Sequence, residues 1–70
     1  MEGIFLNTLD RILQLIEERG LTYRAFQKDL GLNLKTVDNW KRGMSKSYLN
    51  HIVEIAKYFN VSTDYLLGME

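Results

Sequence analysis

Residues 21–40, LTYRAFQKDLGLNLKTVDNW, constrain the fold more than any other part of the chain. Thr22 and Asn33 each precede a short run with helical periodicity, and Gly31 separates the two runs. Glycine adopts positive φ angles without steric cost, so it permits the sharp turn that two adjoining short helices require. The sequence therefore predicts a helix over residues 22–30, a turn at Gly31 and a second helix over residues 33–42.

Three further helices are predicted around this pair. Apolar residues recur at helical spacing in residues 7–19 and 47–59, and residues 62–67 form a last short segment. Hydroxyl and amide side chains that can cap these helices precede or begin each segment: Asn7 or Thr8, Ser45 or Ser47, and Ser62. The predicted apolar stripe of the fourth helix consists of Leu49, Ile52, Val53, Ala56 and Phe59. We therefore expect a compact all-α fold of five helices, forming one domain over residues 1–70.

The composition excludes several classes of function. The chain has 70 residues and no cysteine, so neither a disulfide nor a thiolate metal site is possible. His51 is the only histidine, and we see no nucleophile–base arrangement and no phosphate-cradling glycine loop. We therefore expect no enzyme, no metal and no cofactor. No run approaches the roughly 18 apolar residues of a membrane span, and no signal peptide is recognisable. We expect a cytoplasmic protein with no membrane partner.

The charge is unevenly distributed along the chain. The formal net charge is zero, but residues 21–48 carry six cations against Asp29 and Asp38, which gives +4. The two flanking segments, residues 1–20 and 49–70, are each −2. A polyanion would therefore dock on the middle of the chain. The candidates for phosphate contact are the cations around the second predicted helix of the pair: Arg24, Lys28, Lys41, Arg42 and Lys46. The alternative is a solvated basic face.

The predicted helix over residues 33–42 has two unlike faces. Successive side chains of an α-helix are about 100° apart, so Val37 and Trp40 share one side. We expect that side to pack on the core. The opposite side carries three polar residues and one leucine: Leu34, Lys35, Asp38 and Asn39. The alternative is an ordinary amphipathic surface helix.

The outward residue types can read base edges in double-stranded DNA. Asn39 can pair with adenine N6 and N7, and Lys35 can donate to guanine O6 and N7. Leu34 can pack on a thymine methyl group. Asp38 can accept from cytosine N4, or can instead hold Lys35 or Asn39 in place.

A family resemblance follows from the pattern as a whole. The first part comprises Leu21-Thr22, Leu30-Gly31-Leu32-Asn33, Thr36-Val37, Trp40 and Arg42-Gly43. The second part comprises Leu49, Ile55-Ala56, Phe59-Asn60-Val61-Ser62, Asp64 and Leu66-Leu67-Gly68. From about residue 6 onward, the chain resembles the Cro/λ-repressor-like (XRE-type) helix-turn-helix DNA-binding proteins. The resemblance implies a five-helix λ-repressor-like domain. It also implies that Leu34, Lys35 and Asn39 touch bases and that Tyr23 touches a phosphate.

Three positions depart from the family pattern. Gln27 stands where the family usually has a small residue that packs one helix on the other, so its side chain must bend outward or find a partner. Tyr23 stands where glutamine is common, and its hydroxyl can still bond a phosphate. Leu34 stands where a polar reader is common. The last two bear on the target sequence more than on the fold.

These observations predict a sequence-specific DNA-binding regulator, a repressor of a bacterium or phage, with residues 33–42 in the major groove. A homodimer on an operator with two half-sites is the expected mode of binding. Terminal residues that either pack locally or form a dimer patch are Ile4, Phe5, Tyr65 and Met69. The alternative is a λ-repressor-like fold that serves as a protein-interaction module, such as an antitoxin-like partner; Gln27, Leu34 and the neutral total charge motivate it.

Overall fold

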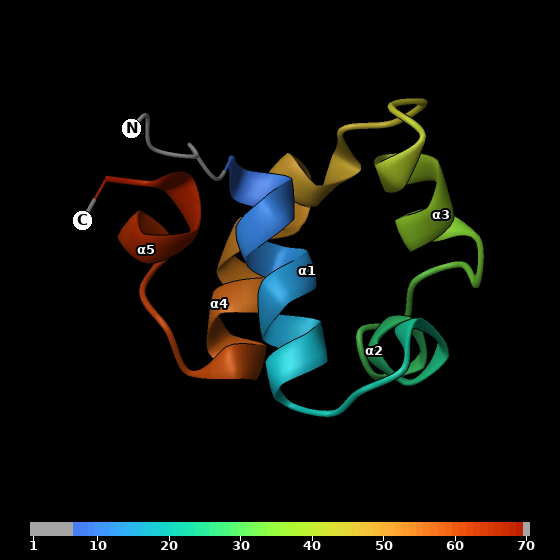
Figure 1. Cartoon of the computed structure of the whole chain (residues 1–70), viewed down its shortest axis with the longest axis horizontal. Coiled ribbons are helices and arrows are strands. Elements are labelled where there is room, and N and C mark those ends of the chain that lie inside the picture. Colours follow the sequence, from blue (N-terminus) through green and yellow to red (C-terminus); the bar gives the residue numbers. More distant parts are fainter. Residues whose placement is uncertain (1–6, 70) are drawn as a thin grey trace, which may run out of the picture.

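The computed structural model describes residues 7–69, and its ordered elements are all helical. The elements are α1 (Thr8–Glu18), α2 (Tyr23–Asp29), α3 (Thr36–Lys41), the 3-10 helix η1 (Ser47–His51), α4 (Ile52–Phe59) and α5 (Thr63–Leu67). In Figure 1, α1 and α4 occupy the middle, α5 lies at one end, and α2 and α3 lie at the other. The predicted all-α class with five α-helices is confirmed within these residues.

Side-chain caps define the starts of three helices. Asn7 Oδ1 accepts from the Asp10 N–H at 2.8 Å, and the Asp10 carboxylate accepts from the Asn7 N–H at 3.3 Å, so α1 begins with a capping box. Thr22 and Ser62 cap α2 and α5 by accepting from Ala25 N and Tyr65 N, each at 3.0 Å. These three caps agree with the sequence, with Asn7 in place of Thr8. The cap predicted for the fourth helix, Ser45 or Ser47, was wrong, because neither η1 nor α4 begins with a side-chain capping bond.

Left-handed residues end the helices and set the turns. Gly31 has φ 71° in the turn between α2 and α3. Asn60, with φ 58° and ψ 47°, ends α4 and is the single non-glycine residue with positive φ within residues 7–69. Asparagine tolerates this conformation better than most residues because its short polar side chain can bond locally. The position of Gly31 agrees with the turn predicted from the sequence.

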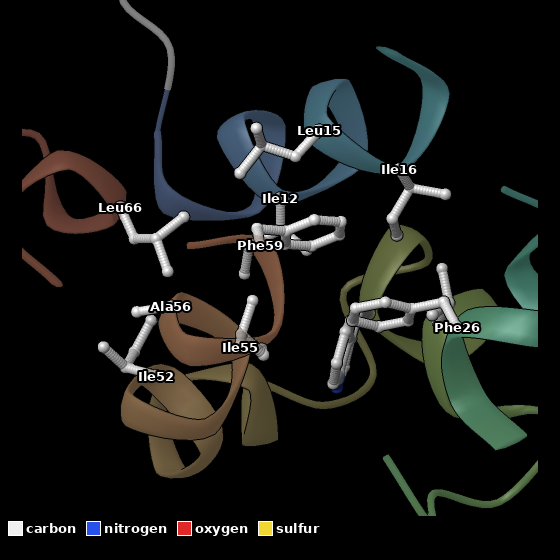
Figure 2. Packing of buried hydrophobic residues seen from close by; sticks show 11 residues of the cluster. Ile12, Leu15, Ile16, Phe26, Ile52, Ile55, Ala56, Phe59 and Leu66 are labelled. Carbon is white, nitrogen blue, oxygen red and sulfur yellow. The ribbon is translucent and has the colours of Figure 1, made fainter. Parts of the chain in front are cut away.

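The core lies where α1, α2, α3, α4 and α5 meet. Its buried side chains are Ile12, Leu15, Ile16, Phe26, Val37, Trp40, Ile52, Ile55, Ala56, Phe59 and Leu66. Figure 2 shows Leu66 of α5 pointing toward Ala56 and Ile52 of α4, and Phe26 of α2 entering from the opposite side. The Phe26 ring stacks on Phe59 with centroids 5.7 Å apart and meets Trp40 edge-on at 6.3 Å. Phe26 therefore joins α2 to both α3 and α4.

The fourth predicted helix, over residues 47–59, is two helices of different pitch. Ser47 Oγ accepts from the Trp40 indole N–H at 2.8 Å, and the Tyr48 ring meets Trp40 edge-on at 5.6 Å. Ser45 Oγ accepts from Ser47 N at 3.2 Å. These contacts hold the start of the segment against α3, and it takes the tighter 3-10 spacing before α4 begins at Ile52.

The predicted apolar stripe of the fourth helix was partly wrong. Leu49 and Val53 are 49% and 56% exposed. The 3-10 turn rotates Leu49 out of line with α4, because its residues are about 120° apart instead of 100°. The buried face of α4 is centred on Ile52 and Ile55, and Val53 lies beside that face.

The helix predicted over residues 33–42 is shorter than expected and begins at Thr36. Asn33 Oδ1 accepts from Lys35 N at 2.8 Å, and the Asn33 carbonyl accepts from Thr36 N at 3.0 Å. An asparagine side chain that bonds the backbone two residues on favours a turn over a helix. Leu34 and Lys35 therefore lie in a turn that leads into α3, and Arg42 is the residue after its end.

Candidate nucleic-acid interface

The helix pair α2–α3 is held from beneath by buried aromatic and aliphatic side chains. Val37 and Trp40 are buried, as the two-faced pattern predicted. Behind α2, the Tyr58 hydroxyl donates to Asp29 Oδ2 at 2.6 Å. This bond to a carboxylate, with smaller contributions from burial and from the Asp29 charge, raises the pKa of Tyr58. The pair is thus fixed to α4 as well as to itself.

The opposite face of α3 and its leading turn are open. Lys35 and Asp38 are exposed, and Leu34 is 54% exposed. Asn39 is half-buried. Three of the four predicted base-contact residues are therefore exposed, and Asn39 is accessible in part. Only Asp38 and Asn39 lie within α3 itself.

Asp38 pairs with a cation that the sequence analysis did not connect with it. Its Oδ2 lies 3.2 Å from Arg42 Nε, one helical turn away. From the sequence, only Lys35 and Asn39 were considered as partners of Asp38. Both partners are well exposed, so the ion pair is weak and a phosphate can compete for Arg42.

Tyr23 and Lys41 come together across the two helices. Lys41 Nζ lies 4.9 Å from the centre of the Tyr23 ring and 3.4 Å from its hydroxyl oxygen. Tyr23 is the first residue of α2 and Lys41 the last residue of α3. The Tyr23 hydroxyl, a neutral donor, and the Lys41 ammonium group therefore lie side by side. This arrangement suits the oxygens of a single phosphate.

The remaining candidate phosphate contacts are also exposed. Arg24 and Lys28 are exposed on α2, and Lys46 is exposed after α3. All the cations of the basic middle segment are exposed, including Lys35, Lys41 and Arg42. The +4 segment of the sequence is therefore an accessible basic region of the folded chain.

Gln27 has found a partner inside the fold. Its side chain is 2% exposed, and its Oε1 accepts from the Val37 N–H at 2.7 Å. The sequence left open whether the Gln27 side chain bends outward or finds a partner, and in the structure it finds a partner. Buried amides are hydrogen-bonded in folded proteins, so a glutamine at a helix–helix contact indicates that a partner exists. The sequence does not show which group that partner is.

The terminal residues divide between packing and exposure. Ile4 and Phe5 lie outside the described residues. Tyr65 is half-buried, with the Arg11 guanidinium 5.5 Å from its ring centre, so it serves local packing. Met69 is exposed.

Within residues 7–69, no group of three or more acidic, histidine or cysteine side chains is placed to hold a metal ion. None of the helices described there has the length and apolarity to cross a membrane.

Comparison with known protein families identifies the helix-turn-helix domain. The family described as the Cro/C1-type HTH DNA-binding domain matches residues 11–70. Searches among curated proteins and among solved structures gave no significant match. The matched region includes α2, the Gly31 turn and α3, whose exposed face carries the basic and amide side chains. The chain therefore belongs to the family of Cro/C1-type helix-turn-helix DNA-binding domains.

Proposed function

We propose that this protein is a sequence-specific regulator of transcription, acting as a repressor in the cytoplasm of a bacterium or in phage biology. The observation that carries the proposal is that α3 is anchored in the core on one side and is open on the other. Val37 and Trp40 are buried beneath it, while its open side lies among exposed cations. A domain built in this way acts by binding, and we propose no catalytic activity for it.

In the proposed complex, α3 and its leading turn enter the major groove. The groove of B-DNA is about 12 Å wide and admits one helix. Lys35 donates to guanine, Asn39 pairs with adenine, and Asp38 accepts from cytosine when it leaves Arg42. Leu34, which is well exposed at the start of this face, packs on a thymine methyl group.

Phosphate contacts surround these readers in the proposal. Tyr23 and Lys41 share one phosphate, which their proximity of 3.4 Å supports. The other phosphate contacts come from the exposed cations Arg24, Lys28, Arg42 and Lys46. A single short helix reads few base pairs, so we propose a homodimer on two half-sites about 34 Å apart.

The test begins with selection of bound sequences from a random duplex library. Against the selected site, Asn39→Ala is expected to cost roughly 1–3 kcal/mol at one position and to relax the preference there. Lys41→Ala is expected to weaken binding to all duplexes alike and to lower the salt slope by about 1. Lys57→Ala on α4 removes an exposed cation outside the basic segment and serves as the control. If Asn39→Ala and Lys41→Ala both leave the affinity unchanged, this binding face is wrong.

Binding of random duplex DNA at low salt distinguishes the proposed function from the alternative, a protein-interaction module. Nonspecific phosphate binding is strongest at low ionic strength, so random duplex DNA should bind at about 50 mM salt. An absence of measurable binding there would favour a protein partner, for which the exposed Leu34 is the motivating residue.

A further inference from the structure

Helix α3 begins without a cap from its own chain segment. The first N–H groups of any α-helix lack partners within the helix. Lys35 holds the N-cap position and makes no side-chain capping bond. The Asn33 carbonyl takes the Thr36 N–H at 3.0 Å, and the Asn33 side chain is occupied by Lys35 N. The next donor, the Val37 N–H, needs an acceptor from elsewhere.

That acceptor comes from the preceding helix. Gln27 Oε1 lies 2.7 Å from Val37 N, and both residues are buried. A capping side chain normally bonds the second or third residue of its own helix, and Val37 is the second residue of α3. The Gln27 carbonyl also accepts from Leu32 N at 2.7 Å, within the turn. One residue of α2 thus bonds both the turn and the start of α3.

We propose that Gln27 is a positioning residue for base recognition: it caps α3 from α2 and fixes how the reading side chains are presented. This inference rests on the proposed DNA-reading function. Lys35 lies two residues before the bonded N–H and Asn39 two residues after it. A recognition site must be held to within about 0.5 Å by buried supporting side chains, and Gln27 is such a support. It reaches no base, yet discrimination between DNA sequences depends on it.

The hydrogen bond, rather than the volume of the side chain, is the essential feature. Methionine has nearly the same length and fills the same space, but its sulfur is a weak acceptor. Gln27→Met therefore leaves the buried Val37 N–H without a good partner, which is costly. Gln27→Glu keeps an acceptor oxygen at the same distance along the side chain. The pair of variants separates the bond from the packing.

The first measurement follows the Val37 amide by NMR without any DNA. In the wild type, we expect a scalar coupling across the hydrogen bond between Val37 N and the Gln27 side-chain carbonyl carbon, and slow hydrogen exchange. In Gln27→Met, exchange at Val37 should be about tenfold faster, because one hydrogen bond no longer opposes opening. Gln14→Met, an exposed position on α1, makes the same substitution away from the interface and should leave Val37 unchanged.

The second measurement is the ratio of affinities for the selected site and for the same site with one changed base pair. Gln27→Met should lower this ratio about tenfold, the size of one base contact, and Gln27→Glu should restore most of it. The ratio is the readout because the added charge of Gln27→Glu weakens binding to every duplex alike. Gln14→Met should leave the ratio at the wild-type value.

Several results would overturn the inference. These are a missing coupling in the wild type, an unchanged ratio in folded Gln27→Met, or equal losses in Gln27→Met and Gln27→Glu. If Gln27→Met does not fold, the coupling in the wild type and the ratio in Gln27→Glu decide. If the wild type binds no duplex, the proposed function fails and the reading role fails with it, whereas the coupling would still establish the cap.

Discussion

The polar side chains of the helix pair divide into those that hold the fold and those left open for a ligand. Gln27 and Asp29 are both on α2, and both are bonded to other elements, α3 and α4 respectively. Lys35, before α3, and Arg24, on α2, are exposed. At the level of single residues, a glutamine or an aspartate in this segment cannot be assigned to the ligand face from its type alone.

The bond between Tyr58 and Asp29 makes stability depend on pH in the alkaline range. Because the folded pKa of Tyr58 is raised, its protonated form favours the folded state. This contribution is fully present below the unfolded pKa of about 10 and is lost as pH rises through the folded pKa. Tyr58→Phe should cost about 1 kcal/mol at pH 7, measured by urea unfolding, and the difference from wild type should shrink above pH ~10.

The control for this prediction is Tyr48→Phe. In the described part of the chain, Tyr48 makes a ring contact with Trp40, and no hydrogen bond of its hydroxyl is present. Loss of the Tyr48 hydroxyl should therefore cost less free energy of unfolding at pH 7 than loss of the Tyr58 hydroxyl. A Tyr58→Phe curve parallel to the wild type at all pH values would contradict the assignment.

The ion pair between Asp38 and Arg42 predicts that removing the carboxylate strengthens nonspecific binding. Asp38→Asn frees the Arg42 guanidinium and removes a negative charge from the proposed interface. Affinity for random duplex DNA should rise several-fold at low salt, and the salt slope should steepen by about 1. Asp64→Asn on α5 changes the total charge equally and should do neither. Equal effects of the two variants would mean that only net charge matters.

At the level of elements, α3 is too short to be stable alone. It spans six residues, and isolated helices shorter than about 12–15 residues are marginal in water. Its conformation therefore depends on the Gly31 turn, on burial of Val37 and Trp40, and on the bond from Gln27. The geometry of the proposed reading face is a property of the α2–α3 pair, not of α3.

The positive φ angle of Gly31 predicts that replacing this glycine by a residue with a side chain destabilises the fold through backbone conformation alone. An added Cβ would meet no atom within 4 Å, but φ is +71°. Gly31→Ala should lower the free energy of unfolding by about 1–2 kcal/mol, and Gly31→Asn should cost less, because asparagine tolerates this region. Gly43→Ala, with φ +75° and equally open space, should match Gly31→Ala. The measurement is urea unfolding followed by the fluorescence of Trp40, the single tryptophan.

A clear excess for Gly31→Ala over Gly43→Ala would point to a clash and contradict this account. Equal costs for Gly31→Ala and Gly31→Asn would show that something other than the left-handed conformation is being measured.

At the level of the whole molecule, the aromatic contacts of Phe26 connect the helix pair to the rest of the core. The ring touches Trp40 of α3 and both Tyr58 and Phe59 of α4. Chains of this size are stable by about 0.05–0.15 kcal/mol per residue, or about 4–10 kcal/mol in total. One buried aromatic ring is therefore a large part of the whole.

Phe26→Ala should cost about 3–5 kcal/mol, a large share of the total stability. Val53→Ala on α4 is the matched contrast, because Val53 is more than half exposed. It should stay within about 0.5 kcal/mol of the wild type. Circular dichroism during urea unfolding measures both. A large loss in Val53→Ala would mean that the exposed side of α4 is covered by another surface in solution.

The sequence by itself determined the starts of α1, α2 and α5, the turn at Gly31 and the buried side of α3. Thr22, Ser62 and Gly31 act through backbone groups a few residues away, so their effects are local and follow from residue type. Burial of Val37 and Trp40 followed from helical periodicity, which is also local. The same reasoning predicted the open side of α3 and the basic segment.

Only the tertiary structure decided how the elements meet. The partner of Gln27 is ten residues away, and that of Tyr58 is 29 residues away. The start of the fourth predicted helix contacts Trp40 through Ser47 and Tyr48, forms a 3-10 helix and leaves Leu49 exposed. Each of these outcomes depends on which side chains from different elements become neighbours. Such neighbours are set by packing of the whole chain, which residue spacing within one segment does not contain.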